Sequence, residues 1–147
     1  MTEVAFHFNA PDKLGYTCRL IRKAYLRGAR LVVLADEKDL AALSAALWTL
    51  APGAFIPHAS ASDASQVWLR SPIQLASSLP VQSDATVLVN LCSGVPSGAD
   101  GFDRIIEVVG GDEADRQLAR ERWKYYKSNG IDPQRHDLQT APLESQN

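Results

Sequence analysis

The sequence has few cysteines, little net charge and no long apolar run, and each of these absences excludes a class of protein. Its two cysteines, Cys18 and Cys92, lie far apart in apolar stretches, which argues against a disulfide-stapled secreted fold and favours small buried thiols. There is no run of about 18 apolar residues that would cross a membrane, and the first residues lack the pattern of a secretory signal. We therefore expect a cytoplasmic protein that has no contact with a membrane.

The net charge of −2 over 147 residues provides no field that would draw the whole molecule onto nucleic acid or anionic lipid. With 46% hydrophobic and 22% charged residues the composition is that of a globular protein, and the length is that of one domain. Any binding of anions must therefore come from a local cluster of cations. We expect a single folded domain over residues 1–132, followed by a polar tail over 133–147 that frays.

Strand and helix patterns alternate along the chain, which is typical of an α/β fold. Alternating apolar residues predict a strand at 4–8, and apolar residues at helical spacing predict a helix over 11–27. The run Leu31-Val32-Val33-Leu34 predicts a strand that is buried on both faces. Further helices are expected at 37–50 and 112–128, and further strands at 67–69, 73–75, 86–89 and 104–109. This order predicts a single Rossmann-like domain with a mostly parallel sheet and helices on both faces.

The glycines that a Rossmann nucleotide site needs in its first strand-to-helix turn are missing, so phosphates could not approach the backbone closely there. The turn reads Asn9-Ala-Pro-Asp-Lys13. Asp36, after the second expected strand, could bind a ribose, but helix capping explains it without a ligand. The glycines of 94–101 are not followed by the Lys-Ser or Lys-Thr of a phosphate loop. A small Rossmann-like nucleotide-binding domain or enzyme remains as the alternative hypothesis.

The histidines and cysteines form no local motif for catalysis or metal binding. His7, His58 and His136 lie in different segments, and none has the i, i+4 partner or Cys-x-x-Cys neighbour that is common in metal sites. Cys92 follows an apolar strand, and burial there would raise the pKa of its thiol, which argues against a catalytic nucleophile. We expect no cofactor and no metal, and a protein that is not an enzyme.

The last expected helix carries a basic face. Four cations recur at i, i+4 or i, i+3 spacing, namely Arg116, Arg120, Lys124 and Lys127. Trp123 lies on the neighbouring surface of the helix. Such a surface suits a peptide with an acidic and aromatic end, because cations would hold its carboxylates while an apolar pocket takes the ring. The pattern alone favours the plainer alternative, an amphipathic helix with Leu118 and Tyr125 inward and its charges in solvent.

A second candidate surface lies near the end of the helix expected at 37–50. Trp48 is followed, across a Pro-Gly break, by Phe55 in a long exposed connection over 51–66. Core packing explains either aromatic residue taken alone. The two together on a connection could instead form an apolar docking patch.

Three motifs have a familiar order and spacing. They are Ala46-Leu47-Trp48, the spaced Phe55-Ile56-Pro57-His58, and Gln117-Leu118-Ala119-Arg120-Glu121-Arg122-Trp123-Lys124 running to Gly130. In these motifs and in its length the chain resembles the chi subunit of the bacterial DNA polymerase III holoenzyme, a small clamp-loader accessory protein. The resemblance implies a Rossmann-like domain without enzymatic activity that serves DNA replication through protein–protein contacts.

The resemblance also implies two partners. The family's pocket for the acidic, Phe-ending tail of single-stranded DNA-binding protein would fall on Val109, Arg116, Arg120, Trp123 and Lys124. Arg120 would be the ligand of the terminal carboxylate. The surface that faces the psi subunit would include Trp48 and Phe55, and a helicase-like protein is a further candidate partner there. We expect no specific contact with nucleic acid, because stacking aromatics are few and the overall charge is acidic.

Overall fold

The computed structural model describes residues 2–49, 57–60, 71–79 and 83–138. In these residues seven strands form one parallel sheet of order β3-β4-β2-β5-β6-β1-β7. The strands are β1 (Glu3–Ala10), β2 (Leu31–Leu34), β3 (His58–Ser60), β4 (Ile73–Ala76), β5 (Val87–Asn90), β6 (Arg104–Gly110) and β7 (Gln134–Asp137). The helices are α1 (Lys13–Leu26), α2 (Glu37–Thr49) and α4 (Glu113–Ser128), with a short 3₁₀ turn, η1, at Ala99–Gly101. The prediction of a Rossmann-like α/β domain is confirmed.

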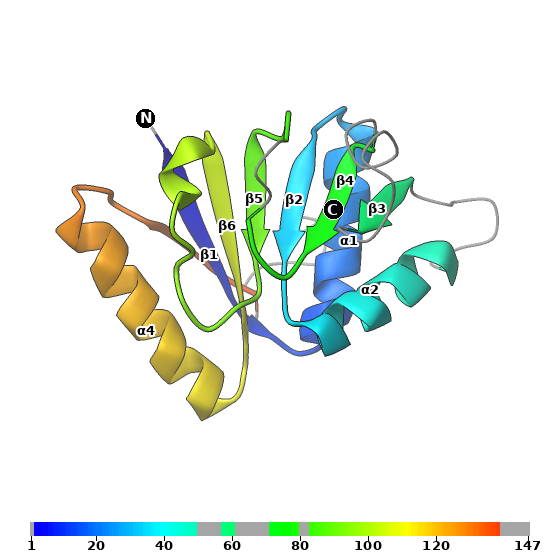
Figure 1. Ribbon diagram of the computed structural model, residues 1–147. Coiled ribbons are helices and arrows are strands. Elements are labelled where there is room, and N and C mark those ends of the chain that lie inside the picture. The colour runs from blue at the N-terminus through cyan, green and yellow to red at the C-terminus, as the bar shows by residue number, and fades with distance from the viewer. Residues whose placement is uncertain (1, 50–56, 61–70, 80–82, 139–147) are drawn as a thin grey trace.

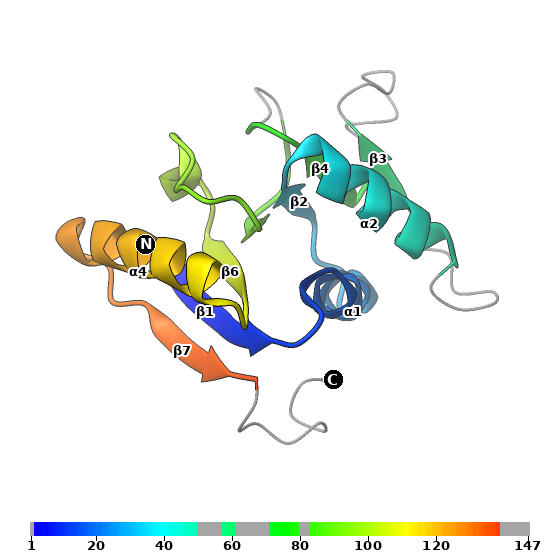
Figure 2. The same cartoon turned by 90° about the horizontal axis from the view of Figure 1, so that it is seen from below.

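Helices cover both faces of the sheet, and each face has its own apolar core. The helices α1 and α2 pack on one face, whereas α4 lies on the other together with the connection from β5 to β6 (Figures 1 and 2). The strand β2 contributes to both cores, because Leu31 and Val33 face one and Val32 and Leu34 face the other. Burial on both faces explains why its sequence is an uninterrupted apolar run. No helix in the described part of the chain is long and apolar enough to cross a membrane.

The ends of the helices follow local chemistry. The side chains of Asp12, Asp36 and Asp112 accept hydrogen bonds from the backbone N–H groups three residues further on, at 3.1, 2.8 and 3.1 Å. These bonds satisfy donors that the first helical turn leaves open. Gly28 and Gly130 follow α1 and α4 with φ of +80°, a left-handed conformation that glycine adopts without strain. Capping therefore accounts for Asp36 without a ligand.

The strand β3 lies inside the connection that was expected to be exposed over 51–66. It pairs with β4 at an edge of the described sheet, and Ala59 is buried. A strand of three residues with one apolar side chain has no alternation that would distinguish it from a loop. The strand expected at 67–69 lies outside the described residues.

The strand β7 corrects the predicted domain boundary. The polar tail expected from 133 onward instead begins with a strand that pairs in parallel with β1 at the opposite edge of the described sheet. Asn9 Nδ2 donates to Asp137 Oδ1 at 3.0 Å, and Leu138 N donates to Phe8 O at 3.0 Å. The boundary at 132 is therefore wrong, because backbone pairing carries the domain to residue 138. Edge strands with polar side chains give little signal in sequence.

Candidate functional site

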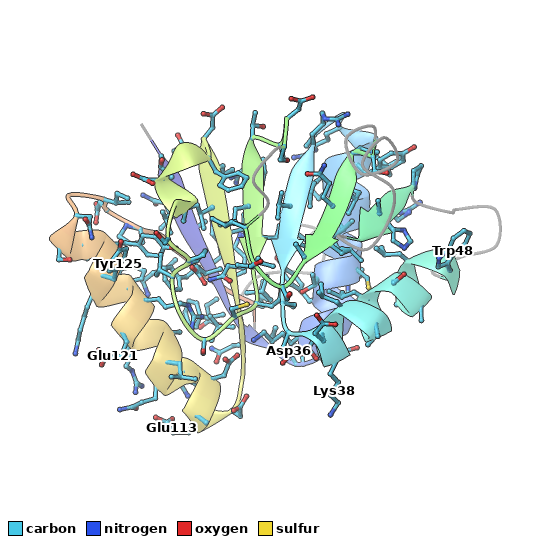
Figure 3. All side chains as sticks on the ribbon, in the orientation of Figure 1. Asp36, Lys38, Trp48, Glu113, Glu121 and Tyr125 are labelled. Atoms are coloured by element: carbon cyan, nitrogen blue, oxygen red, sulfur yellow. The ribbon has the colours of Figure 1, made fainter. Side chains whose placement is uncertain are left out.

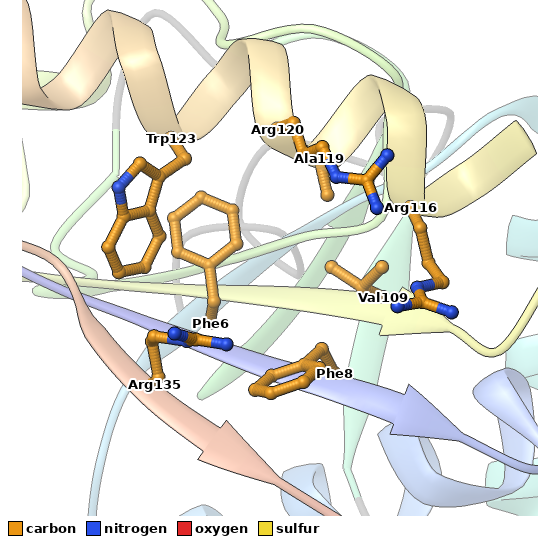
Figure 4. Close-up of a pocket in the computed structure, with 8 residues that line it drawn as sticks. All are labelled: Phe6, Phe8, Val109, Arg116, Ala119, Arg120, Trp123 and Arg135. Atoms are coloured by element: carbon orange, nitrogen blue, oxygen red, sulfur yellow. The ribbon is translucent and has the colours of Figure 1, made fainter. Parts of the chain in front are cut away.

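A pocket of about 330 Å³ opens between α4, β1 and β7 (Figure 4). It is lined by Phe6, Phe8, Val109, Arg116, Ala119, Arg120, Trp123 and Arg135, and we call it the arginine pocket. Its floor is apolar and its rim is basic. Two of the three arginines approach from α4 and the third from β7, so cations flank the floor on two sides.

The floor of the arginine pocket is packed in advance of any ligand. Phe6 is buried, and its ring centroid lies 5.2 Å from that of Trp123 and 5.9 Å from that of Tyr126, ordinary distances for aromatic pairs. Val109 and Ala119 are also buried, whereas Trp123 is half-buried. A ring that enters the pocket would therefore meet a rigid apolar surface, which lowers the conformational cost of binding it.

The two arginines of α4 share an acidic neighbour. Arg120 Nη1 lies 3.2 Å from Glu113 Oε1 and donates to Gln117 Oε1 at 2.9 Å. Arg116 Nη1 lies 4.0 Å from Glu113 Oε2. Such exposed pairs contribute only ~0–1 kcal/mol each to stability. Glu113 nevertheless keeps both guanidinium groups close to each other, in a place where a ligand carboxylate could replace it.

Four of the five residues predicted for the tail pocket come together in the structure. They are Val109, Arg116, Arg120 and Trp123. Lys124 does not line the pocket: its side chain is 73% exposed, and its Nζ lies 3.7 Å from Glu121 Oε1. Lys127 Nζ pairs with Asp132 at 3.2 Å. The basic face of the helix is therefore divided, with the arginines at the pocket and the lysines outside it.

Four lining residues were missed by sequence reasoning, namely Phe6, Phe8, Ala119 and Arg135. Three of them carry a usable signal. Phe6 and Phe8 share one face of an alternating strand, and Ala119 lies one turn from both Arg116 and Trp123 on the helix. Arg135 gives no such signal, because it reaches the pocket only through the pairing of β7 with β1.

A buried polar network fixes α4 against the sheet and so positions the arginine pocket. Arg122 Nε donates to Glu107 Oε1 at 2.8 Å, and Tyr126 OH donates to Glu107 Oε2 at 2.6 Å. Asn90 Nδ2 donates to both carboxylate oxygens at 3.1 Å. Burial raises the pKa of Glu107, while the Arg122 guanidinium and the hydrogen bonds from Tyr126 and Asn90 oppose that rise. With these partners the buried carboxylate is well satisfied.

The network also corrects the predicted orientation of the last helix. Leu118 and Tyr125, the residues that an amphipathic helix would turn inward, are 43% and 52% exposed. The buried residues of α4 are Ala119, Arg122 and Tyr126. An arginine is turned inward because the sheet beneath it offers a buried carboxylate, which a hydrophobicity pattern does not reveal.

The edge where Rossmann-like folds bind nucleotides carries an ion pair between Lys13 and Asp115. It lies at the carboxyl ends of β1, β5 and β6. Lys13 Nζ lies 3.0 Å from Asp115 Oδ2 and donates to Leu91 O at 3.3 Å. Gly110 N donates to the same Asp115 oxygen at 2.7 Å. A phosphate at this edge would meet the Asp115 carboxylate and compete for Lys13, so the geometry does not support the nucleotide-binding alternative.

Both cysteine thiols are harder to ionise than a free cysteine. Burial raises the pKa of the Cys92 thiol, as the sequence predicts, and the buried Cys18 thiol shifts in the same direction for the same reason. Thiols with raised pKa are poor nucleophiles. The described residues also bring together no group of three side chains that could hold a metal ion.

The second candidate surface lies at the end of α2, on the opposite side of the molecule from α4 (Figure 3). The side chain of Trp48 is 61% exposed, so core packing does not explain it. Its ring centroid lies 5.8 Å from that of His58 in an edge-to-face arrangement, and the His58 Nε2 is 3.0 Å from Ser44 Oγ. Phe55 lies outside the described residues.

Residues 1–134 match the family described as DNA polymerase III chi subunit, HolC. This chain belongs to that family. The chi subunit of Pseudomonas aeruginosa is 31% identical over 143 residues, which cover 94% of this chain and 98% of that protein. The chi subunit of Escherichia coli K12 is 28% identical over 116 residues, or 78% of each chain. That of Haemophilus influenzae is 26% identical over 114 residues, which cover 77% of this chain and 78% of that protein.

Solved structures with the same fold include the C-terminal domain of the DEAD-box protein Dbp5. The S. cerevisiae domain bound to Gle1 and IP6 has a TM-score of 0.60 at 13% identity, with 99% of this chain and 95% of that chain covered. A second structure of the Dbp5 C-terminal domain has a TM-score of 0.60 at 12% identity, with coverage of 94% and 91%. At such low identity the likeness shows the fold alone.

Membership of the chi family decides the class of function. Chi is an accessory subunit of DNA polymerase III and is not catalytic, so the predictions of a role in DNA replication and of a protein without enzymatic activity are confirmed. A subunit of the polymerase implies a partner in the replication complex. Within the described residues, the arginine pocket and the exposed end of α2 around Trp48, which we call the Trp48 surface, are two candidate places for such contacts.

Proposed function

We propose that this chi protein links the DNA polymerase III clamp loader to single-stranded DNA-binding protein, whose acidic, Phe-ending tail binds in the arginine pocket. The observation that carries the proposal is an apolar floor large enough for a ring, with three guanidinium groups at its rim. A terminal phenylalanine complements the floor formed by Phe6 and Trp123, and the tail's carboxylates complement the arginines. DNA is a less suitable ligand, because the net charge of −2 provides no field that would attract a polyanion to the molecule.

Arg120 is the proposed ligand of the terminal carboxylate. Its side chain is 53% exposed and already lies at the pocket, where Gln117 and Glu113 hold it. Binding of a carboxylate would replace the contact with Glu113 and keep the hydrogen bond to Gln117. Because one exposed ion pair is exchanged for another, the net gain should not exceed the range for a hydrogen bond to a charged group, about 1.5 to 3 kcal/mol.

Calorimetry with a synthetic tail peptide tests this assignment. Arg120→Ala should weaken binding by about 1.5 to 3 kcal/mol, and added salt should weaken the wild-type complex because the rim is exposed. The control is Lys38→Ala, which removes an exposed cation from α2 and should leave the affinity unchanged. An Arg120→Ala variant that binds the peptide as tightly as the wild type would sink the assignment.

The Trp48 surface is the proposed contact with psi. Exposed tryptophans are frequent anchors of interfaces, and the place of Trp48 at the end of α2 leaves the arginine pocket accessible. Phe55 is proposed for the same contact from the family resemblance, and a helicase-like protein is the alternative occupant. A role at the replication fork would also place the protein in the cytoplasm.

Copurification of the two proteins tests the psi contact. Trp48→Ala should lose psi and keep the tail peptide, whereas Arg120→Ala should do the reverse. Leu26→Ala is the matched control, because Leu26 is 66% exposed on α1 and belongs to neither surface. Retention of psi by the Trp48→Ala variant would exclude Trp48 from that contact.

A further inference from the structure

One cation of the arginine pocket lies outside the helix motif. Arg135 comes from β7, and its Cζ lies 5.4 Å from the centroid of the Phe8 ring, within the range of a cation–π contact. In the described residues no carboxylate oxygen lies within 4.0 Å of its guanidinium nitrogens, whereas Arg116 and Arg120 share Glu113. Among the described residues, no carboxylate therefore neutralises the charge of Arg135, and its guanidinium contacts the ring of Phe8.

The backbone of β7 holds Arg135 in that place. Register pairs Arg135 with Phe6 on β1, and the bond from Asn9 Nδ2 to Asp137 Oδ1 at 3.0 Å fixes the strand two residues further on. Asn9 has a φ of 63°, a left-handed conformation that asparagine tolerates better than most residues. The guanidinium is thus presented before a ligand arrives, which reduces the entropy that binding costs.

The charges at the rim favour a ligand with more than one acidic group. Three guanidinium groups line the pocket, and among the described residues the carboxylate of Glu113 alone lies within 4.0 Å of any of them, namely of Arg116 and Arg120. One ligand carboxylate would therefore leave a positive charge unbalanced. The guanidinium of Arg135 and those of α4 lie on opposite sides of the apolar floor (Figure 4), so two carboxylates of one chain end can reach them without competing for the same donors.

We propose, building on the proposed function, that Arg135 is a specificity-determining residue of the arginine pocket. It binds an acidic side chain that precedes the aromatic end of the ligand, while Arg120 binds the terminal carboxylate. The pocket then selects a peptide end with two separate acidic groups rather than a free aromatic terminus alone. Arg120 on α4 thus recognises the chain terminus, and Arg135 on β7 recognises the acidic side chain that precedes it.

A double-mutant cycle between protein and peptide tests the division. Three peptides are titrated: an aromatic-ended acidic peptide, the same peptide with its side-chain carboxylates changed to amides, and the same peptide with an amidated terminus. Arg135→Gln should weaken the acidic peptide about threefold to tenfold, between the ranges for exposed and desolvated charged contacts. It should leave the affinity for the side-chain amide peptide unchanged. Arg120→Gln should weaken binding of the acidic peptide but should not change the affinity for the peptide with the amidated terminus, which lacks the carboxylate that Arg120 binds.

The control is Arg22→Gln, which removes the same charge from an exposed position on α1 and should change none of the affinities. Arg135→Glu should favour a peptide that carries lysine before its aromatic end, a gain that a misfolded variant would not show. Equal losses of Arg135→Gln for the acidic and the amide peptide, or no loss for either, would overturn the role of Arg135 and leave Arg120 untouched. If the wild type binds none of the peptides, the proposed function falls together with this inference.

Discussion

Arg120 and Arg122 are two residues apart on α4, and each lies against a glutamate, but their surroundings differ. Arg122 is 2% exposed and donates to Glu107, which is fully buried, at 2.8 Å. Arg120 is 53% exposed and lies 3.2 Å from Glu113, itself 69% exposed. The buried pair has lost its water and must keep its partner. The exposed pair can exchange its partner at little cost.

The difference teaches how one helix serves both stability and binding. The buried pair holds α4 on the sheet, with Tyr126 and Asn90 satisfying the rest of the carboxylate. The exposed pair leaves a guanidinium available at the arginine pocket. Neither role follows from the residue type, since both pairs are Arg with Glu.

The largest expected effect comes from breaking the buried pair. Arg122→Ala leaves the Glu107 carboxylate buried without its cation and should lower the free energy of unfolding by about 3 to 5 kcal/mol. Arg120→Ala is the matched control and should change it by less than ~1 kcal/mol. Urea denaturation of both variants measures the contrast. Equal destabilisation of the two would break the distinction between a structural and a binding arginine.

His7 is a further group whose burial affects stability, and a pH titration tests its contribution. Burial, with the nearby charges of His136, Arg104 and Lys23, lowers the pKa of His7 to about 4 from 6.5. The unfolded chain therefore takes up a proton as the pH falls below about 6.5, whereas the folded chain does so only near 4. The free energy of unfolding should therefore have its full value above pH ~6.5 and should decline toward pH ~4. The expected decline is about 2 kcal/mol, because His7 is not fully buried.

Thermal unfolding between pH 7 and 4 measures this decline, and His7→Phe should flatten it. The ring of His7 faces that of His136 on β7, with centroids 4.8 Å apart. Protonation of folded His7 should weaken the pairing of β7 and lower tail binding through Arg135, but only as the pH approaches about 4, the pKa of His7 in the folded protein. A His7→Phe variant with an unchanged pH dependence would assign the decline to other groups.

A smaller effect is expected when Glu113, the acidic partner of Arg120 in the exposed pair, is replaced. Glu113→Gln removes the carboxylate that competes for Arg120 and Arg116, so tail binding should tighten about twofold to fivefold, the value of one exposed ion pair. Stability should change little. Calorimetry beside thermal unfolding measures both. Weaker binding by this variant would mean that Glu113 positions the arginines rather than competing with the ligand.

The smallest effect is expected at Lys124, which belongs to the basic face but not to the pocket. Lys124→Ala should weaken tail binding less than about twofold, through screened long-range attraction only. Titrations at two salt concentrations should show the remaining difference disappear at the higher one. A loss as large as that of Arg120→Ala would extend the binding site beyond the arginine pocket.

The elements that the sequence predicts well are those with a local cause. The β2 run is apolar because both of its faces are covered, and the three aspartate caps act within three residues of themselves. The grouping of Arg116, Arg120 and Trp123 is equally local, because one helix places them on neighbouring faces. Half of the eight residues that line the proposed pocket could therefore be named in advance, and the motif that contains three of the eight resembles the chi family.

Tertiary structure alone decided the rest. The strand β7 and with it Arg135 join the pocket through backbone pairing with β1, and polar side chains give such an edge strand no hydrophobic period. The choice of Arg122 rather than Leu118 as an inward residue depends on Glu107, fifteen positions away in sequence and on another element. Local chemistry thus determined the helices, the buried strands and the family motif, whereas long-range pairing of backbone and of charge decided which arginine is structural and which are free to bind.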